Sequence, residues 1–316
     1  MENRKWRPLN RPELGMMDSI SKIIQEEEWR NPDLLTSLHQ GSTLLIASDY
    51  GGDHAKAAFK SLSFLVADLE GCAVWEELRL GVRLKLLKDS RRMAYKNLKD
   101  RRRSDALIPF LRAADNIPGL LATFLFDRRV QSIFGPDSKD AEVDKDSHLS
   151  PESWTPRAFE RLCRVSHLGS LLVSGLSVAG QNVIWLTDED EIAPNKTQHF
   201  RATQLIAHHM SHYCVHPMGH FRFGTTRSDT GKLDIEDLVS VADLAAGATS
   251  EVATALFEEG RFPEGKLLIP PAKATATKAL KIAGWLAEDH WPLRRLVFVV
   301  EFVPPDKFKS KLLRLF

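Results

Sequence analysis

Short apolar runs that end at an acidic residue or a glycine recur along the chain. Residues 42–49 (STLLIASD) form one such run, and Tyr50, Gly51 and Gly52 follow it as a turn. Residues 61–69 (SLSFLVADL) form the next run after a short connection. Runs of this length predict buried strands, and the short connection predicts an antiparallel hairpin. Further strands are expected at 119–126, 182–186, 219–226 and 295–303.

Helical patterns separate most of these strands. A long pattern without proline predicts one helix over 75–103, and a second helix is expected at 104–115, which Pro109 interrupts. Further helices are expected at 157–178, 197–213, 235–258 and 272–287. A hairpin followed by alternating helices and strands suits a mixed sheet that is covered by helices. The predicted fold class is therefore α/β.

One main domain with two extensions is the organisation that these elements favour. Residues 1–40 are polar and partly helical, and we interpret them as a cap or an oligomer contact. Residues 41–260 hold the main domain, and residues 261–316 add a helix and a strand that pack on it. The polar stretch 134–152 is expected to be a mobile loop.

Composition narrows the class of protein without indicating a function. The 316 residues are 43% hydrophobic and carry a formal net charge of +1, so any basic surface must be local. Three cysteines without a CxxC pair favour a reducing compartment over a disulfide scaffold. The first residues lack the apolar core of a signal peptide, and no apolar run is long enough to span a membrane. These features predict a cytoplasmic protein.

Three aspartates stand out as candidates for chemistry. Asp49 and Asp188 each follow an apolar strand, and Asp243 lies in the apolar helical segment 238–248. Asp49 could also be an ordinary turn residue, and Asp188 could belong to a solvated loop with Glu189 and Asp190. A buried Asp243 needs a partner, because an isolated buried carboxylate is very costly. That partner could be a metal ion, an arginine or a backbone donor.

Convergence of the three aspartates would create a site for a hard divalent cation. Mg²⁺ or Mn²⁺ prefers such carboxylate oxygens. Two ions about 4 Å apart would permit in-line attack of water on a phosphodiester. Lys96 could neutralise phosphate charge at that site, and His220 could act there as a general acid or base.

The order of these segments resembles the ribonuclease H-like superfamily. In particular, it resembles a widespread group of uncharacterised bacterial and archaeal domains that open with Asp-Glu-Ser-Gly and close with an Ala-Asp-Leu-Val-Ala-Gly helix. The resemblance covers about residues 42–258 and implies a mixed sheet flanked by helices. The stretches that carry it are Ser48-Asp49-Tyr50-Gly51-Gly52, Tyr95-Lys96-Asn97-Leu98, Trp185-Leu186-Thr187-Asp188-Glu189 and Val241-Ala242-Asp243-Leu244-Ala245-Ala246-Gly247.

Two positions depart from that pattern. Tyr50 replaces an acid that follows the first aspartate, and Ala94 replaces an acid two residues before the lysine. Because fewer acids weaken metal binding, these departures bear on activity more than on fold.

Basic residues recur every three or four positions in the predicted helix 75–103. On one helix they would share a face that could follow a phosphate backbone, although such a stripe is also typical of a solvated surface. These residues are Lys85, Lys88, Arg92, Lys96, Lys99 and Arg103.

Five histidines cluster around Cys214, namely His208, His209, His212, His216 and His220. His208 and His212 are four residues apart and could share a metal on a helix. An HExxH signature is missing, so exposed or capping histidines are the favoured interpretation.

Three functions are therefore open. The first is a metal-dependent phosphodiester hydrolase of the nuclease type. The second is a catalytically inactive ribonuclease H-like module that binds nucleic acid or a protein partner, including a second copy of the chain. The third is nucleotide binding at Asp49-Tyr50-Gly51-Gly52, for which the sequence offers no second phosphate loop.

Overall fold

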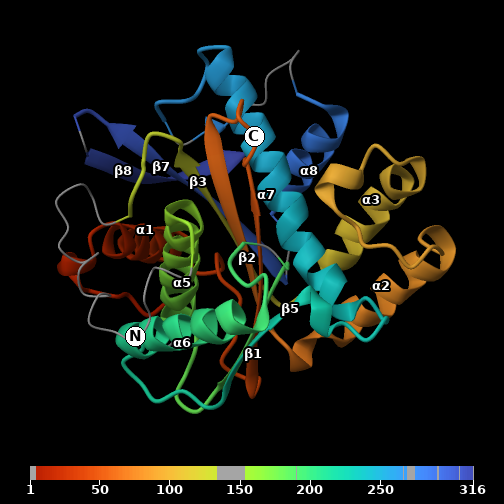
Figure 1. Cartoon of the computed structure of the whole chain (residues 1–316), viewed down its shortest axis with the longest axis horizontal. Helices are drawn as coiled ribbons and strands as arrows, with labels where there is room; N and C mark the ends of the chain where they lie inside the picture. The colour runs from red at the N-terminus through yellow and green to blue at the C-terminus, as the bar shows by residue number, and fades with distance from the viewer. Residues whose placement is uncertain are drawn as a thin grey trace.

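A mixed β-sheet forms the centre of the molecule (Figure 1). This computed structural model describes residues 5–133, 154–189, 191–265, 267–268, 275–289, 292–305 and 307–315. The strands are β1 (Thr43–Gly51), β2 (Phe59–Asp68), β3 (Gly119–Asp127), β4 (Asn182–Thr187), β5 (Phe221–Thr225), β6 (Leu267–Leu268), β7 (Leu293–Val303) and β8 (Lys307–Leu315). The predicted loop over 134–152 lies outside the described residues.

The strand order confirms the predicted fold class. Among the described residues the sheet has eight strands in the order β5-β4-β1-β2-β3-β7-β8-β6. Strands β1 and β2 form the expected antiparallel hairpin, and β3 pairs antiparallel with β2. Strands β4 and β5 run parallel to β1. A five-strand unit in which only the second strand is reversed is the arrangement of the ribonuclease H-like fold.

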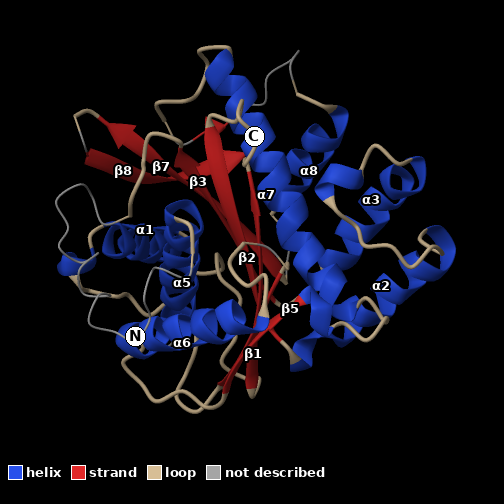
Figure 2. Ribbon diagram, in the orientation of Figure 1, coloured by secondary structure: helices blue, strands red, loops and turns tan. Residues whose placement is uncertain are grey.

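Helices cover both faces of the sheet (Figure 2). One face carries α1 (Met16–Arg30), α5 (Pro156–Leu176) and α6 (Lys196–Tyr213). The other carries α2 (Ala73–Leu86), α3 (Arg101–Ala114), α7 (Asp234–Glu258) and α8 (Thr277–Ala287). Side chains of a strand alternate between faces, so Leu44 and Ile46 enter the α5 side while Leu45 and Ala47 enter the α7 side.

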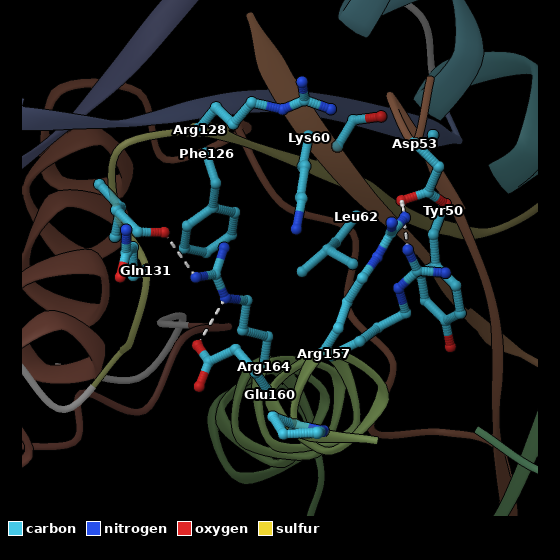
Figure 3. Close-up of a pocket in the computed structure, with 15 residues that line it drawn as sticks. Tyr50, Asp53, Lys60, Leu62, Phe126, Arg128, Gln131, Arg157, Glu160 and Arg164 are labelled. Atoms are coloured by element: carbon cyan, nitrogen blue, oxygen red, sulfur yellow. Dashed lines mark hydrogen bonds and ion pairs between the residues drawn. The ribbon is translucent and has the colours of Figure 1, made fainter. Parts of the chain in front are cut away.

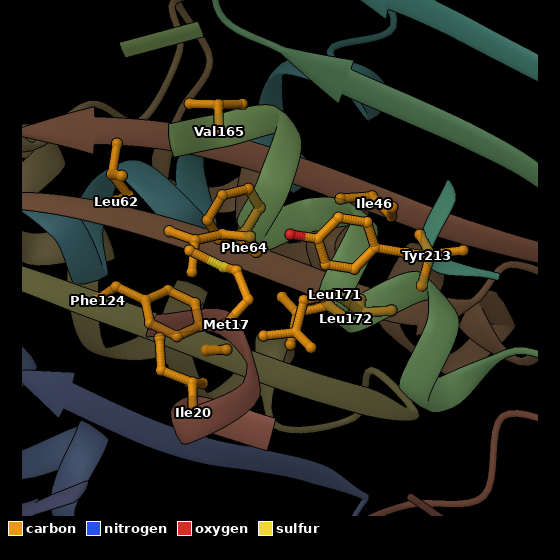
Figure 4. Packing of buried hydrophobic residues seen from close by; sticks show 14 of the residues in the cluster. Met17, Ile20, Ile46, Leu62, Phe64, Phe124, Val165, Leu171, Leu172 and Tyr213 are labelled. Atoms are coloured by element: carbon orange, nitrogen blue, oxygen red, sulfur yellow. The ribbon is translucent and has the colours of Figure 1, made fainter. Parts of the chain in front are cut away.

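The hydrophobic core between the sheet and helices α5 and α6 includes the N-terminal extension (Figure 4). Met17 and Ile20 of α1 are buried among residues such as Phe64, Phe124 and Leu171. Helix α1 therefore contributes to the core on this face of the sheet, and the interpretation of residues 1–40 as a cap or an oligomer contact stays a prediction.

Two expectations for the secondary structure were wrong. The helix predicted over 75–103 ends at Leu86, and the chain then runs irregularly to a 3-10 turn at Tyr95–Asn97 before α3 begins at Arg101. Leu87 already leaves the helical conformation (φ −119°), and Ser90 in the irregular segment is left-handed (φ 52°). The Asp100 side chain then caps α3. Pro109 lies inside α3 instead of interrupting it. The C-terminal residues also form an additional strand, β8.

No helix in the part of the chain that the structure describes combines the length and apolar character needed to cross a membrane.

Candidate active site: an aspartate cluster around Arg92

Asp49 and Asp188 lie side by side at one edge of the sheet. Strands β1 and β4 are parallel neighbours, and Ser48 is in register with Thr187. The residues that follow these two in the sequence are Asp49 and Asp188. Ala47 and Leu186 face the α7 side of the sheet. Alternation along each strand therefore directs both carboxylates towards α7.

Asp243 reaches the same place from helix α7, which packs on this face of the sheet. The Asp229 carboxylate accepts the backbone N–H groups of Leu233, Ile235 and Glu236 and so fixes the start of α7. Further along the helix, a Cβ on Gly51 would lie 3.0 Å from the carbonyl oxygen of Ala246, so the helix and the end of β1 are in close contact. The structure thus brings all three predicted aspartates together.

Arg92 lies at the centre of this cluster. Its guanidinium is 2.7 Å from Asp188 Oδ1, 3.3 Å from Asp49 Oδ2 and 3.5 Å from Glu236 Oε2. Asp243 instead accepts a hydrogen bond from the backbone N–H of Tyr95 at 2.6 Å. We define the carboxylate cluster as Asp49, Asp188, Asp243 and Glu236. One guanidinium therefore contacts three of the four acids.

The cluster carries more negative charge than its neighbours compensate. Burial raises the pKa of Asp49 well above its usual range, and the charges of Asp243 and Asp188 raise it further. Burial likewise raises the pKa of Asp243 and of Glu236. The positive charges of Arg92 and Lys96 lower the pKa of Asp243 without cancelling the effect of burial. Such shifts are typical of a functional site and also occur in structural ion networks.

The donor set suits a hard cation in chemistry, but the guanidinium fills its centre. Glu236 Oε2 is buried and accepts no hydrogen bond, which is an unmet demand for a donor or a cation. In this arrangement, however, no group of three or more His, Cys, Asp or Glu side chains among the described residues is placed to hold a metal ion. A metal and Arg92 would therefore compete for the same carboxylates.

A basic cleft of about 570 Å³ adjoins the cluster. Arg92 and Glu236 belong to both the cluster and the cleft wall. Lys96 and Lys99 line the cleft, and the positive charge of Lys96 lowers the pKa of Asp243, whereas an orientation of Lys96 towards the aspartates stays a prediction. We call this space the Arg92 cleft. It gives an anionic ligand a route to the carboxylates.

The expected basic stripe on one helix does not exist. Lys85 is exposed near the end of α2, and Lys88 is exposed in the segment that follows it. Arg92 turns inward to the aspartates, and the buried Arg103 donates to the backbone oxygen of Arg92 at 3.1 Å. Because the helix breaks after Leu86, the six basic residues do not share a face.

His220 lies at the wrong end of its strand for the predicted role. It precedes Phe221, the first residue of β5, whereas Thr225 at the other end is in register with Thr187. Five residue steps separate His220 from Thr225, which corresponds to about 17 Å at the usual rise. The residue that reaches the cluster from β5 is Thr226, whose hydroxyl donates to Asp188 Oδ1 at 3.0 Å.

The other histidines serve separate structural contacts. His209 and His167 are buried with ring centroids 4.0 Å apart, and His209 Nδ1 pairs with the Ser166 hydroxyl at 2.7 Å. His212 contacts Arg11, and His216 contacts Arg7. His208 is exposed. The pairing of His208 with His212 on a metal therefore gains no support from the structure.

Sequence reasoning missed two parts of the site. Glu236 joins the cluster from the first turn of α7, and its signal was the acidic opening Asp234-Ile235-Glu236-Asp237. Tyr95 fills the space left by Gly247, where a Cβ would collide with its ring, and its hydroxyl donates to Glu251 at 2.6 Å. Tyr50, which replaces the acid of the family pattern, bonds Thr187 through its hydroxyl at 2.9 Å.

No protein-family model matches the chain, and no curated protein sequence is significantly similar to it. Among solved structures, the ribonuclease H2 from Pyrococcus horikoshii OT3 is similar to this chain with a TM-score of 0.34 and 15% identity, over 77% of this chain and 85% of that one. The α/β fold class of this chain therefore rests on the order and direction of its strands.

Proposed function

We propose that this chain is a metal-dependent phosphodiester hydrolase of the nuclease type, whose metal replaces Arg92 among the aspartates. The observation that supports this proposal is the charge imbalance of the cluster. One guanidinium contacts three of the four carboxylates, and Asp243 instead accepts a hydrogen bond from the backbone N–H of Tyr95. Burial raises the pKa values of Asp49, Asp243 and Glu236. A divalent cation would supply the missing positive charge.

In this proposal the aspartates bind the metal, and the basic residues of the Arg92 cleft bind the nucleic acid. Asp49, Asp188 and Asp243 would hold Mg²⁺ or Mn²⁺, which polarises a phosphoryl oxygen and makes bound water more acidic. Lys96 and Lys99 line the Arg92 cleft and can hold the phosphate backbone of a nucleic acid. Arg92 lines the same cleft, so on leaving the carboxylates it can pair with phosphate.

A second function has one observation in its favour. Arg92 already pairs with both Asp49 and Asp188, and an arginine in a metal's position is what an inactive binding module would retain. In that case the Arg92 cleft would bind nucleic acid or a protein partner without cleavage.

Metal titration of matched variants separates these functions. Mn²⁺ binding is measured by calorimetry for the wild type, Arg92→Ala, Asp243→Asn and the control Asp105→Asn, which alters an exposed aspartate of α3. The hydrolase proposal expects tighter binding in Arg92→Ala, loss of binding in Asp243→Asn and no change in Asp105→Asn. Cleavage of labelled DNA and RNA should fall at least about 10²-fold in Asp243→Asn.

Absence of metal binding would contradict the hydrolase proposal. If neither the wild type nor Arg92→Ala binds Mn²⁺ or Mg²⁺, the hydrolase proposal is wrong. Nucleic-acid binding that persists without any metal would then support the inactive module.

A further inference from the structure

A second basic cavity lies on the opposite face of the sheet from the carboxylate cluster. It measures about 240 Å³ and is bounded by the ends of β1 and β3, the start of β2 and the first turns of α5. Lys60 and Leu62 lie two residues apart in β2, and Leu62 belongs to the α5-side core. Alternation therefore directs Lys60 to the α5 side (Figure 3), whereas Asp49 faces the α7 side. We call this space the Lys60 cavity.

Cationic side chains dominate its wall. Two carboxylates, Asp53 and Glu160, face five cations. These cations are Lys60, Arg128, Arg157, Arg161 and Arg164. An excess of positive charge in a partly enclosed space attracts anions. The amino end of the long helix α5 adds a partial positive charge at the same place.

The arginines are held in position by contacts that leave the cavity open. Arg164 donates to Glu160 at 2.8 Å and to the backbone oxygen of Val130 at 2.7 Å. Arg157 and Arg161 both pair with the half-exposed Asp53. Arg161 also lies 3.1 Å from Glu191, outside the cavity wall. Asp53 is thus an internal acceptor that an incoming anion could replace.

Arg128 is fixed from the opposite side of the cavity. Its guanidinium donates to the backbone oxygens of Ala55 and His54 at 2.6 and 2.8 Å. Because carbonyl oxygens leave its full charge uncancelled, Arg128 adds to the positive field.

Lys60 is the group that lacks a counter-ion. Among the described residues, no hydrogen bond or ion pair to its ammonium is present. Figure 3 shows its side chain directed into the space between Arg157 and Arg164. Burial lowers the pKa of Lys60, and the charges of Arg164, Arg157 and Arg161 lower it further. An anion in the cavity would remove this repulsion.

We propose that the Lys60 cavity binds the phosphate group of a nucleotide, either free or at the end of a strand. Phosphate offers several acceptor oxygens and up to two negative charges, which suits an ammonium between arginines better than a single carboxylate does. The volume of 240 Å³ equals that of about eight waters, which is enough for a phosphate and part of its sugar. This proposal is independent of metal binding or cleavage at the carboxylate cluster.

Calorimetric titration of the full chain tests the proposal. The probes are inorganic phosphate, a nucleoside 5′-monophosphate, the nucleoside without phosphate, and one oligonucleotide with either a 5′-phosphate or a 5′-hydroxyl. Lys60→Met should weaken binding of the phosphorylated probes about tenfold or more, since it removes a charge-assisted hydrogen bond. Lys56→Met is the matched control, because Lys56 is exposed and outside the cavity wall, and it should bind like the wild type.

A gain of affinity provides a check that a folding defect cannot imitate. Asp53→Asn removes the negative charge that pairs with Arg157 and Arg161, so it should tighten phosphate binding severalfold. A 5′-phosphate preference in the oligonucleotide identifies a strand end as the ligand, whereas tight binding of the monophosphate with no such preference identifies a free nucleotide. Absence of binding by every phosphorylated probe overturns the proposal. Equal binding by the wild type and Lys60→Met also overturns it.

Discussion

Replacement of Arg92 by alanine would leave the carboxylate cluster without its central counter-ion. Removing one partner of a buried ion pair costs about 3–5 kcal/mol in general. The Arg92 side chain is 20% exposed, and Asp49 is 9% exposed. Solvent therefore screens part of the interaction, and protonation of Asp49 or Asp243 can relieve part of the repulsion. We expect the free energy of unfolding to fall by about 2–3 kcal/mol at neutral pH.

The pH dependence of this loss follows from the raised pKa values. In Arg92→Ala the folded cluster holds protons more tightly than the unfolded chain, so lowering the pH favours the folded form. The deficit relative to the wild type should shrink as the pH falls from about 7 towards about 4, where unfolded aspartates titrate. If the cluster accepts a metal, Mn²⁺ at about 100 times its dissociation constant should restore about 2.7 kcal/mol.

Urea denaturation, followed by circular dichroism at several pH values with and without Mn²⁺, measures these quantities. Arg91→Ala is the matched control, since the Arg91 side chain is 63% exposed and pairs with Asp89 outside the carboxylate cluster. It should change stability by less than about 0.5 kcal/mol. A loss in Arg92→Ala that is equally small, and that stays constant with pH, would refute the electrostatic reasoning.

Three further predictions concern the scaffold. Asp237→Asn should destabilise the protein by about 3–5 kcal/mol in urea denaturation, because Arg79 and Arg83 both pair with this buried carboxylate, and a stability like that of the wild type would contradict the pairing. Gly169→Ala should lower stability by about 1–3 kcal/mol, because a Cβ at this position collides with the indole of Trp185, and Gly284→Ala, which meets no atom within 4 Å, is its control. Burial lowers the pKa of His167 to about 4 and of His209 to about 2, so the unfolded chain binds more protons and stability should fall as the pH drops below about 6.5. His209→Asn should flatten that fall in a series of denaturation curves, and an unchanged slope would show that another group is responsible.

The strand ends could be predicted from the sequence, because apolar runs closed by an acid carry their own signal. Asp49 and Asp188 meet because the two strands are parallel neighbours, and Asp243 joins them because the small residues of α7 allow close contact with β1. The role of Arg92 could not be predicted in the same way. Its position depends on the end of α2 at Leu86, after which Leu87 and the left-handed Ser90 depart from an otherwise helical pattern.

The direction of β5 determines which of its ends lies near the aspartates. Both ends of the segment carried polar residues, namely His220 and Thr226, and the sequence alone did not show which end faces the aspartates. Carboxyl ends of parallel strands meet at one edge of a sheet, so Thr226 lies at the cluster and His220 does not. The Lys60 cavity was missed because its cations come from strand β2, the loop after β3 and helix α5, which are far apart in the sequence.

Two adjacent residues at the end of β1 belong to two different sites. Asp49 faces the carboxylate cluster, and the next residue, Tyr50, lines the Lys60 cavity on the other side of the sheet. A change of backbone at either residue is therefore transmitted to both faces, so substitutions there cannot separate the two sites experimentally. Lys60 and Asp243 lie on different elements, and a double-mutant cycle between them would measure any energetic communication across the sheet.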